Sequence, residues 1–230
     1  MHVKVESAVK DYGSSRVLDI ESIEFKKGIY VILGSNGSGK STLISCIAGL
    51  NELNSGNIFY DGKKMDFAIR NSICIQVQKP YLFNKSSYEN IVSGLKFRKS
   101  SREEIETRYN KYKDYFEIEE LLSKKSWWLS GGERAKIALL RTAVLETEMT
   151  LLDEPTAAMD IESSMRAENL IKDMAKDNRT VILVTHDVYQ AKRIANHVIF
   201  MDKGRIIEMG SMEHVLNNPT NKLVKQILNI

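Results

Sequence analysis

The sequence predicts an α/β protein with a mainly parallel sheet, an antiparallel β subdomain at the N-terminus and a helical insert. Short apolar runs at 29–33, 150–153, 180–185 and 197–201 are strand-like, and helix-like stretches lie between them. Alternation of this kind is typical of a largely parallel sheet covered by helices. A charged, helically periodic stretch that begins near Ser86 interrupts the pattern and indicates the insert.

Local patterns within the segments support this division. Residues 2–9 alternate between apolar and polar side chains, as a strand with one buried face does, and Asp61-Gly62 is a turn signal between two expected hairpin strands. In the insert, Ser101 and Glu104 have the spacing of a helix capping box.

Length and composition are those of one globular domain. The 230 residues, 43% of them apolar, are enough for one hydrophobic core. We therefore predict a single domain over 1–230, in which 1–85 and 129–230 form the core with its β subdomain and 86–128 form the helical subdomain.

The charge and cysteine content exclude several kinds of protein. The 33 basic and 30 acidic residues leave a net charge of +3, too small to indicate a nucleic-acid-binding stripe or a polybasic membrane anchor. No apolar run approaches the roughly 18 residues of a membrane span, and the N-terminus lacks the apolar stretch of a signal peptide. Cys46 and Cys74 lie among apolar neighbours, which favours buried thiols over a disulfide or a metal site. We expect a cytosolic protein.

A glycine-rich loop follows the strand-like run that ends at Leu33. The segment GSNGSGKST matches the pattern G-x-x-x-x-G-K-[ST] and precedes a helix-like stretch, which is the context that this phosphate-binding motif requires. Its glycines let backbone N–H groups point at the phosphates, and the helix N-terminus adds a positive end. Lys40 is expected to reach the outer phosphates and Ser41 to bind Mg²⁺. The residues assigned to phosphate binding are Gly34, Ser35, Asn36, Gly37, Ser38, Gly39, Lys40, Ser41 and Thr42.

Two adjacent acids, Asp153 and Glu154, end another strand-like run. Ionised carboxylates at the end of a buried strand are costly unless a cation or strong donors meet them, and a metal–nucleotide site explains them better than a surface turn. We expect Asp153 to hold Mg²⁺, through water, and Glu154 to polarise the attacking water.

A second helix start with free N–H groups lies at Ser130, Gly131 and Gly132. It opens a helix-like run with apolar residues at Ile137 and Leu140, and such a start should bind an anion. Taken alone, Ser-Gly-Gly is equally compatible with a simple helix cap.

The ordered set of motifs resembles the ATP-binding subunit of ABC transporters over nearly the whole chain. The set is GSNGSGKST at 34–42, LSGGE at 129–133, LLDEPT at 151–156 and VTHD at 184–187. The resemblance implies a P-loop NTPase core of the RecA-like, ABC type that hydrolyses ATP with Mg²⁺. It also implies a homodimer on ATP binding, in which two subunits pack head to tail. Each ATP then lies between the phosphate loop of one subunit and the Ser-Gly-Gly segment of the other.

Four more site residues are implied by the resemblance. Tyr12 resembles the aromatic residue that stacks on adenine, His186 the histidine that contacts the γ-phosphate, and Asp160 the residue that couples the two sites of the dimer. Gln78 resembles the glutamine that touches Mg²⁺ or water and reports to the membrane partner. Gln76 is the rival for that role, because alternation would put both on one side of a strand, but the Gln-x-Pro spacing favours Gln78.

Some positions depart from the family pattern. Glu133 stands where the family usually has Gln, and since a γ-phosphate would repel its carboxylate, we expect it to turn away and to gain from the dipole of the helix. AAMD at 157–160 replaces the commoner Ser-Ala-Leu-Asp. Trp127 and Trp128 precede the second helix start, and we expect them to pack against it rather than to take part in chemistry.

Without a membrane span, the chain must pass the energy of ATP to separate transmembrane permease subunits from the cytoplasmic face of the membrane. QAKRIA at 190–195 and LSGGE are similar to ATPases of oxyanion uptake systems, so tungstate is the first choice of solute, delivered by an extracytoplasmic solute-binding protein. The chain ends after LVKQILNI, and we expect no added regulatory domain. The alternatives are another importer, of phosphate or an amino acid, an exporter, an ABC ATPase that acts on nucleic acid, and a binding module without turnover. We expect no nucleic-acid partner, because related ATPases of that kind carry long coiled-coil insertions or two cassettes.

Overall fold

The computed structural model describes residues 1–229, which form two compact units. The first unit contains Met1–Ile75, Glu148–Asp153 and the chain from Ala175 onward, and the second contains Gln76–Thr147 and Glu154–Met174. The second unit includes the 86–128 segment and extends beyond it on both sides. The chain therefore changes unit between Asp153 and Glu154.

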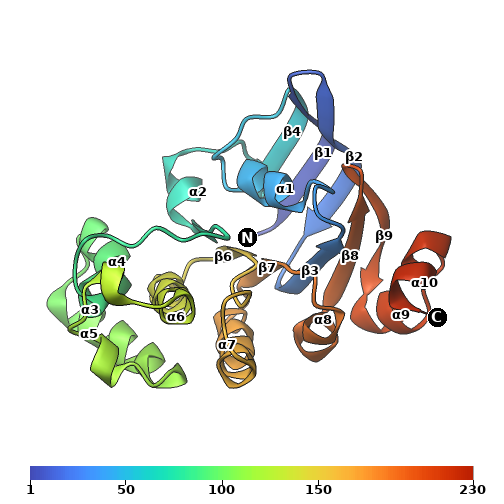
Figure 1. The fold of residues 1–230 in the computed structure, drawn as a ribbon. Helices are drawn as coiled ribbons and strands as arrows, with labels where there is room; N and C mark the ends of the chain where they lie inside the picture. Colours follow the sequence, from blue (N-terminus) through green and yellow to red (C-terminus); the bar gives the residue numbers. More distant parts are fainter. Residues whose placement is uncertain (230) are drawn as a thin grey trace. The chain divides into compact units, whose positions relative to one another are not determined.

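The first unit begins with the antiparallel sheet that the sequence predicts (Figure 1). Its strand order is β2-β1-β4, and β1 pairs antiparallel with both neighbours. The strands are β1 (Val3–Tyr12), β2 (Ser15–Phe25) and β4 (Ser55–Tyr60). After β4, the Asp61-Gly62 turn closes only a single bridge between Tyr60 and Lys63, so the expected second hairpin strand does not form.

The first unit also contains the mainly parallel sheet, in the order β5-β6-β7-β3-β8-β9. β3 pairs parallel with β7 and β8, β6 pairs parallel with β7, and β9 is antiparallel to β8. Every residue of β6 and β7 is buried, which explains their continuous apolar sequences. The strands are β3 (Gly28–Gly34), β5 (Ile73–Gln76), β6 (Met149–Asp153), β7 (Thr180–Val184), β8 (His197–Asp202) and β9 (Arg205–Ser211).

Helix α1 joins the two sheets of the first unit in one core. It contacts β2 of the antiparallel sheet and β3, β6 and β7 of the parallel sheet. Its buried Leu43, Ile44 and Ile47 belong to the same cluster as Ile20 of β2 and Ile32 of β3. The helices of this unit are α1 (Lys40–Ile47), α2 (Phe67–Asn71), α8 (Val188–Ile194), α9 (Met212–Asn217) and α10 (Lys222–Leu228). This packing fixes the start of α1, and with it the phosphate loop.

The second unit is helical. Helix α6 packs against α3 and α7, and it buries Ile137 and Leu140, as its apolar spacing predicts. Ser101 caps α5 by accepting the Glu104 N–H at 3.1 Å, one of the two bonds of a capping box. The helices are α3 (Ser87–Ile91), α4 (Ser93–Phe97), α5 (Arg102–Tyr112), α6 (Gly131–Ala143) and α7 (Ile161–Met174), with short 3₁₀ turns at 113–115, 119–121 and 126–128.

Candidate ATP site

The phosphate loop connects β3 to α1 in the first unit. Gly39 is the residue before α1 and has φ 98°, a conformation that strains any residue with a Cβ. A Cβ at Gly39 would also lie 2.6 Å from the carbonyl oxygen of Val17. Glycine is therefore required here by backbone conformation and by close packing, two independent reasons.

Two side chains of the loop fit a phosphate ligand. Lys40 is buried, and its Nζ donates to the carbonyl oxygens of Gly34 at 2.9 Å and Ser35 at 2.8 Å, so the ammonium lies inside the curl of the loop. The Ser38 hydroxyl is buried and, within residues 1–229, has no hydrogen-bond partner. A buried hydroxyl without a partner is costly, and a phosphate oxygen would satisfy it. The loop thus fits a triphosphate.

The acidic pair divides at the end of β6. Asp153 is the buried last residue of the strand, whereas Glu154 is half-buried and has φ 48°. A non-glycine residue in the left-handed region is unusual, and such strain concentrates at functional sites. The two consecutive residues thus differ in burial and in backbone conformation, which suits two different roles.

His186 lies in a short connection between β7 and α8. Asp187 caps α8 by accepting the N–H groups of Tyr189 at 2.8 Å and Gln190 at 3.0 Å, and the Asp187 N–H donates to Thr185 Oγ1 at 3.1 Å. These bonds fix both neighbours of His186, and the His186 side chain itself is exposed. The histidine is thus presented from an anchored turn.

The second helix start lies in the second unit, at the beginning of α6. Ser130 is the N-cap residue, and it forms a complete capping box with Glu133. The Glu133 N–H donates to Ser130 Oγ at 3.2 Å, and the Ser130 N–H donates to Glu133 Oε2 at 2.7 Å. Glu133 therefore folds back onto the helix start. The Ser-x-x-Glu spacing that predicts a capping box at Ser101 is also present here, so this box can be predicted from the sequence.

The capping bonds also stabilise the charged form of Glu133. The hydrogen bond from the Ser130 backbone is the main cause of a lowered pKa of this carboxyl group. Lys124 contributes to the same shift, with its Nζ 3.6 Å from Glu133 Oε1. Lys124 is a further residue of this region that no sequence motif marks, because the pair is nine residues apart in an irregular segment.

One cavity of the second unit brings three predicted residues together. It has a volume of about 380 Å³ and includes Gln78, Gly131 and Glu154 in its lining. The start of α6 also packs closely on the segment after Glu154, since a Cβ at Gly132 would lie 2.9 Å from the Ala158 carbonyl oxygen. Glu154 and the second helix start thus belong to one packed region.

Gln76 and Gln78 differ in their surroundings. Gln76 ends β5 and is buried, and its Oε1 accepts the Thr142 hydroxyl at 3.4 Å. Gln78 follows the strand and is exposed. The alternation expected for both residues is wrong because the strand ends before Gln78. The burial and bond of Gln76 favour Gln78 as the ligand residue, in agreement with the spacing to Pro80.

Tyr12 and Asp160 lie at the ends of elements. Tyr12 ends β1, is 51% exposed and lies 5.2 Å from Lys10 Nζ, so one ring face carries a cation. The Asp160 carboxylate accepts the Ser163 N–H at 2.7 Å and the Ser163 hydroxyl at 2.9 Å at the start of α7. The Ser163 backbone bond is the main cause of its lowered pKa. AAMD therefore holds Asp160 as a charged helix cap.

The two tryptophans lie in the short 3₁₀ turn at 126–128, in which Ser126 is the buried residue. Trp128 is 74% exposed and Trp127 is 48% exposed, with Lys125 Nζ 5.0 Å from the Trp127 ring centre.

A metal at this site cannot rely on a cage of protein ligands. Across the described residues 1–229, no group of three or more His, Cys, Asp and Glu side chains could hold a metal ion. Mg²⁺ commonly binds through one or two protein oxygens, substrate phosphates and water. Ser41, exposed at the second position of α1, and Asp153 are oxygen donors of this type.

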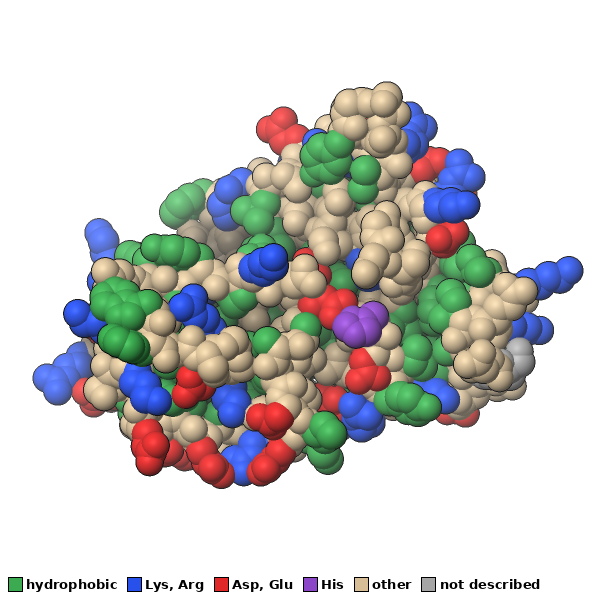
Figure 2. All heavy atoms as spheres, in the orientation of Figure 1, with side chains coloured by type: hydrophobic (Ala, Val, Ile, Leu, Met, Phe, Trp, Pro, Cys, Tyr) green, Lys and Arg blue, Asp and Glu red, His purple; other side chains and the backbone are tan. Residues whose placement is uncertain are grey.

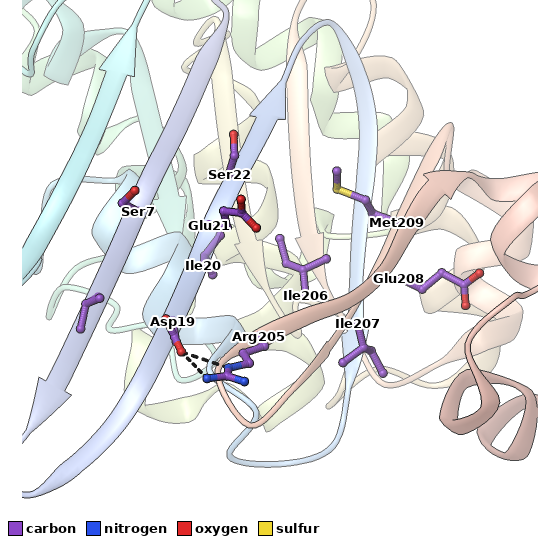
Figure 3. Close-up of a pocket in the computed structure, with 11 residues that line it drawn as sticks. Ser7, Asp19, Ile20, Glu21, Ser22, Arg205, Ile206, Ile207, Glu208 and Met209 are labelled. Atoms are coloured by element: carbon purple, nitrogen blue, oxygen red, sulfur yellow. Dashed lines mark hydrogen bonds and ion pairs between the residues drawn. The ribbon is translucent and has the colours of Figure 1, made fainter.

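A different cavity, of about 670 Å³, lies between β2 and β9 in the first unit (Figure 3). Arg205 donates to Asp19 Oδ2 across it, at 3.0 Å from Nε and 2.6 Å from Nη2. The Glu208 carboxylate turns away from it and accepts the N–H groups of Thr220 and Asn221. None of the predicted site residues lines this cavity.

Comparison with known proteins agrees with the fold and with the phosphate loop. The ABC transporter family matches residues 19–157, and this chain belongs to that family. It is an ABC-type ATPase, a protein that hydrolyses ATP on a P-loop core.

Individual relatives cover almost all of the chain. The tungstate uptake system ATP-binding protein TupC of Peptoclostridium acidaminophilum is 37% identical over 90% of this chain and 98% of its own. The glutamine transport ATP-binding protein GlnQ of Escherichia coli (strain K12) is 32% identical over 98% of each chain. A dimeric post-hydrolysis structure of the ATP-binding cassette MJ0796, bound to ADP and Pi, is 26% identical, with a TM-score of 0.82 over 91% of this chain and 98% of its own.

Proposed function

We propose that this chain powers the uptake of a solute through separate permease subunits, by dimerising around two ATP molecules at the cytoplasmic face of the membrane. The observation that carries the proposal is the presence of two anion-binding helix starts in one chain, at Lys40 and at Ser130. No helix within the described residues 1–229 has the length and apolarity to cross a bilayer, so the proposal assigns transport itself to partner subunits.

In the proposed site, the first unit binds the nucleotide. The ring of Tyr12 stacks on adenine, and the phosphate loop donates its N–H groups to the phosphates, with Lys40 at the outer ones. Ser41, Asp153 and Gln78 hold Mg²⁺, directly or through water. When bound, the ion would neutralise negative charge on the β- and γ-phosphates.

Hydrolysis in this proposal depends on Glu154 and His186. Glu154 accepts a proton from the attacking water and orients it toward the γ-phosphate. His186 donates a hydrogen bond to a γ-phosphate oxygen from its anchored turn. The contact of His186 is to a γ-phosphate oxygen, which ADP lacks, so this contact distinguishes ATP from ADP.

A second copy completes each site in this proposal. Ser130, Gly131 and Gly132 of one copy donate a hydroxyl and N–H groups to the γ-phosphate bound by the other copy, and Asp160 couples the two sites across the interface. When the γ-phosphate leaves, these bonds are lost and the dimer loosens, because ATP binds the dimer better than ADP does. The dimeric post-hydrolysis structure of the cassette MJ0796 supports dimerisation.

An exposed aromatic patch in the segment that follows Gln78 supports the proposal that a partner protein binds there. We define it as Tyr81, Phe83 and Phe97, whose rings meet edge to face with centres 5.8 Å apart for each neighbouring pair. Tyr81 is 72% exposed and Phe97 is 70% exposed. The surrounding stretch 79–102 has six Lys or Arg residues and one Glu, so a permease segment with apolar and acidic side chains would fit. Over the visible face as a whole, basic and acidic side chains are interspersed (Figure 2).

We propose that the solute is an oxyanion, and tungstate is the first candidate. The support is the 37% identity to the tungstate uptake ATPase, together with the similarity of 190–195 and the helix start to oxyanion systems. The main rival is an amino acid, since the glutamine transport ATPase is 32% identical.

Transport is the direct test. The chain is co-expressed with the permease subunits and the solute-binding protein encoded beside it, and uptake of tungstate, phosphate and glutamine is measured in cells that lack their own systems. We expect ATP-dependent tungstate uptake that Lys40→Ala abolishes. Uptake of glutamine alone would contradict the oxyanion proposal, and copurification with nucleic acid instead of permease would contradict transport.

A further inference from the structure

We propose that Glu133 raises the ATP concentration at which this protein dimerises, and that Lys124 partly offsets this effect. The inference rests on the proposed function, because it concerns the Ser130 helix start that a second copy presents to ATP. It assigns to Glu133 a role in setting affinity without a contact to the nucleotide.

The Glu133 carboxylate occupies part of the helix start that is proposed to bind phosphate. Its Oε2 accepts the Ser130 N–H at 2.7 Å, and the Glu133 N–H is used by Ser130 Oγ. The N–H groups of Gly131 and Gly132 remain, because donors in the first helical turn have no acceptor within the helix. A phosphate that binds those two donors must therefore lie beside a carboxylate.

The same carboxylate has opposite effects in the monomer and in the ATP-bound dimer. In the monomer it caps α6, and the interaction of its negative charge with the positive end of the helix dipole stabilises the helix start. In the dimer, two like charges lie close together, and their repulsion grows when the second copy excludes water from the site. Glu133 therefore stabilises the free helix start more than the phosphate-bound one.

Lys124 is placed to weaken that repulsion. Its Nζ lies 3.6 Å from Glu133 Oε1, while Glu133 Oε2 is held by Ser130. The lysine side chain is 42% exposed and that of Glu133 is 26% exposed, so the pair is only partly screened by water. Removal of Lys124 leaves the carboxylate uncompensated and should have the opposite effect to removal of the Glu133 charge.

The test measures ATP-driven dimerisation in a Glu154→Gln background, which is expected to hold ATP without turnover. Sedimentation velocity gives the midpoint, the ATP concentration at which dimer formation is half-maximal. It is measured for the Glu154→Gln parent and for two double variants, in which Glu133→Gln or Lys124→Met is added to the parent. Glutamine also completes a capping box, so Glu133→Gln removes the charge and keeps the cap. We expect a midpoint about tenfold lower for Glu133→Gln and about threefold higher for Lys124→Met, with both shifts reduced in 1 M salt.

Glu89→Gln is the matched control. Glu89 forms the same box with Ser86 at the start of α3, where the Ser86 N–H donates to Glu89 Oε2 at 3.2 Å. This change removes an equivalent charge and should leave the midpoint unchanged. If Glu133→Gln and Glu89→Gln have equal midpoints, the inference about Glu133 is overturned and the proposed function is not. A parent that stays monomeric with ATP overturns the proposed function, and the inference with it.

Discussion

At the scale of single residues, the candidate site is marked by groups in unfavourable states. Glu154 has a left-handed backbone, and the Ser38 hydroxyl is buried with no hydrogen-bond partner in the described chain. Lys40 is a buried ammonium that contacts carbonyl oxygens of its own loop. Backbone strain and a buried hydroxyl without a hydrogen-bond partner are costly by themselves, and such groups concentrate at functional sites.

Glu154→Gln should retain ATP and lose hydrolysis. The amide cannot accept the proton of the attacking water, and the loss of a general base lowers turnover by about 10²- to 10⁴-fold. Phosphate release gives the rate, and a sizing column should show a dimer that persists with ATP. Glu162→Gln, a change at an exposed carboxyl of α7, serves as the control. Hydrolysis of ATP by Glu154→Gln at the wild-type rate would show that Glu154 is not the general base.

Lys40→Ala should weaken the binding of ATP itself. The change removes a charged donor from the phosphates, and such a bond contributes about 1.5–3 kcal/mol, or about 10- to 100-fold in affinity. Titration with a fluorescent ATP analogue measures the effect, with the exposed Lys26→Ala as the control. Unchanged affinity would contradict the phosphate-loop assignment.

At the scale of elements, the site residues lie at the ends of helices and strands whose caps fix their positions. Ser130, Asp160 and Asp187 each cap a helix, and each lies within or beside a predicted motif. The motifs therefore carry structural information as well as chemistry. A cap residue can alter turnover by moving its neighbour, without any contact to the nucleotide.

Asp187→Ala should destabilise the protein and slow hydrolysis together. It removes both bonds from the start of α8, which costs about 1 kcal/mol and lowers Tm by about 2–4 °C. Turnover should fall because His186 loses its anchored turn. Asp187→Asn keeps the cap and should restore Tm and activity, as differential scanning calorimetry and ATPase assays would report. An unaltered Tm in Asp187→Ala would show that the cap does not hold this turn.

At the scale of the whole molecule, the two helix starts that we predict to bind anions belong to different compact units. The phosphate loop lies in the first unit, and Ser130 lies in the second. A dimer that uses both in each site explains why a small protein has two.

Ser130→Arg should separate ATP binding from dimerisation. A bulky cation at the start of α6 blocks the approach of a second copy, while the phosphate loop of each chain stays intact. Equilibrium dialysis should give near-normal ATP affinity, and sedimentation of the Glu154→Gln parent with this change should give monomer. Ser86→Arg places the same side chain at the cap of α3 and should still allow the dimer. A dimer of normal strength in Ser130→Arg would refute the shared site.

The sequence by itself determined the class of fold, the phosphate loop and the family. These features depend on local rules: the strand-like runs at 29–33 and 150–153 became β3 and β6, and glycine is required at Gly39 by backbone conformation. Motifs in a fixed order need no knowledge of packing to be identified.

The tertiary structure alone decided the surroundings of each side chain. The sequence favoured Gln78 over Gln76 from the spacing to Pro80, and only the structure shows that Gln76 is buried and bonded to Thr142. The sequence does not predict the exposure of Trp128, which is 74% exposed. The bonds between Glu133 and Ser130 follow the local Ser-x-x-Glu spacing, whereas the approach of Lys124 depends on how an irregular segment folds back onto α6. The Lys124–Glu133 contact joins residues whose separation in the chain follows no period, so no spacing in the sequence could have predicted it.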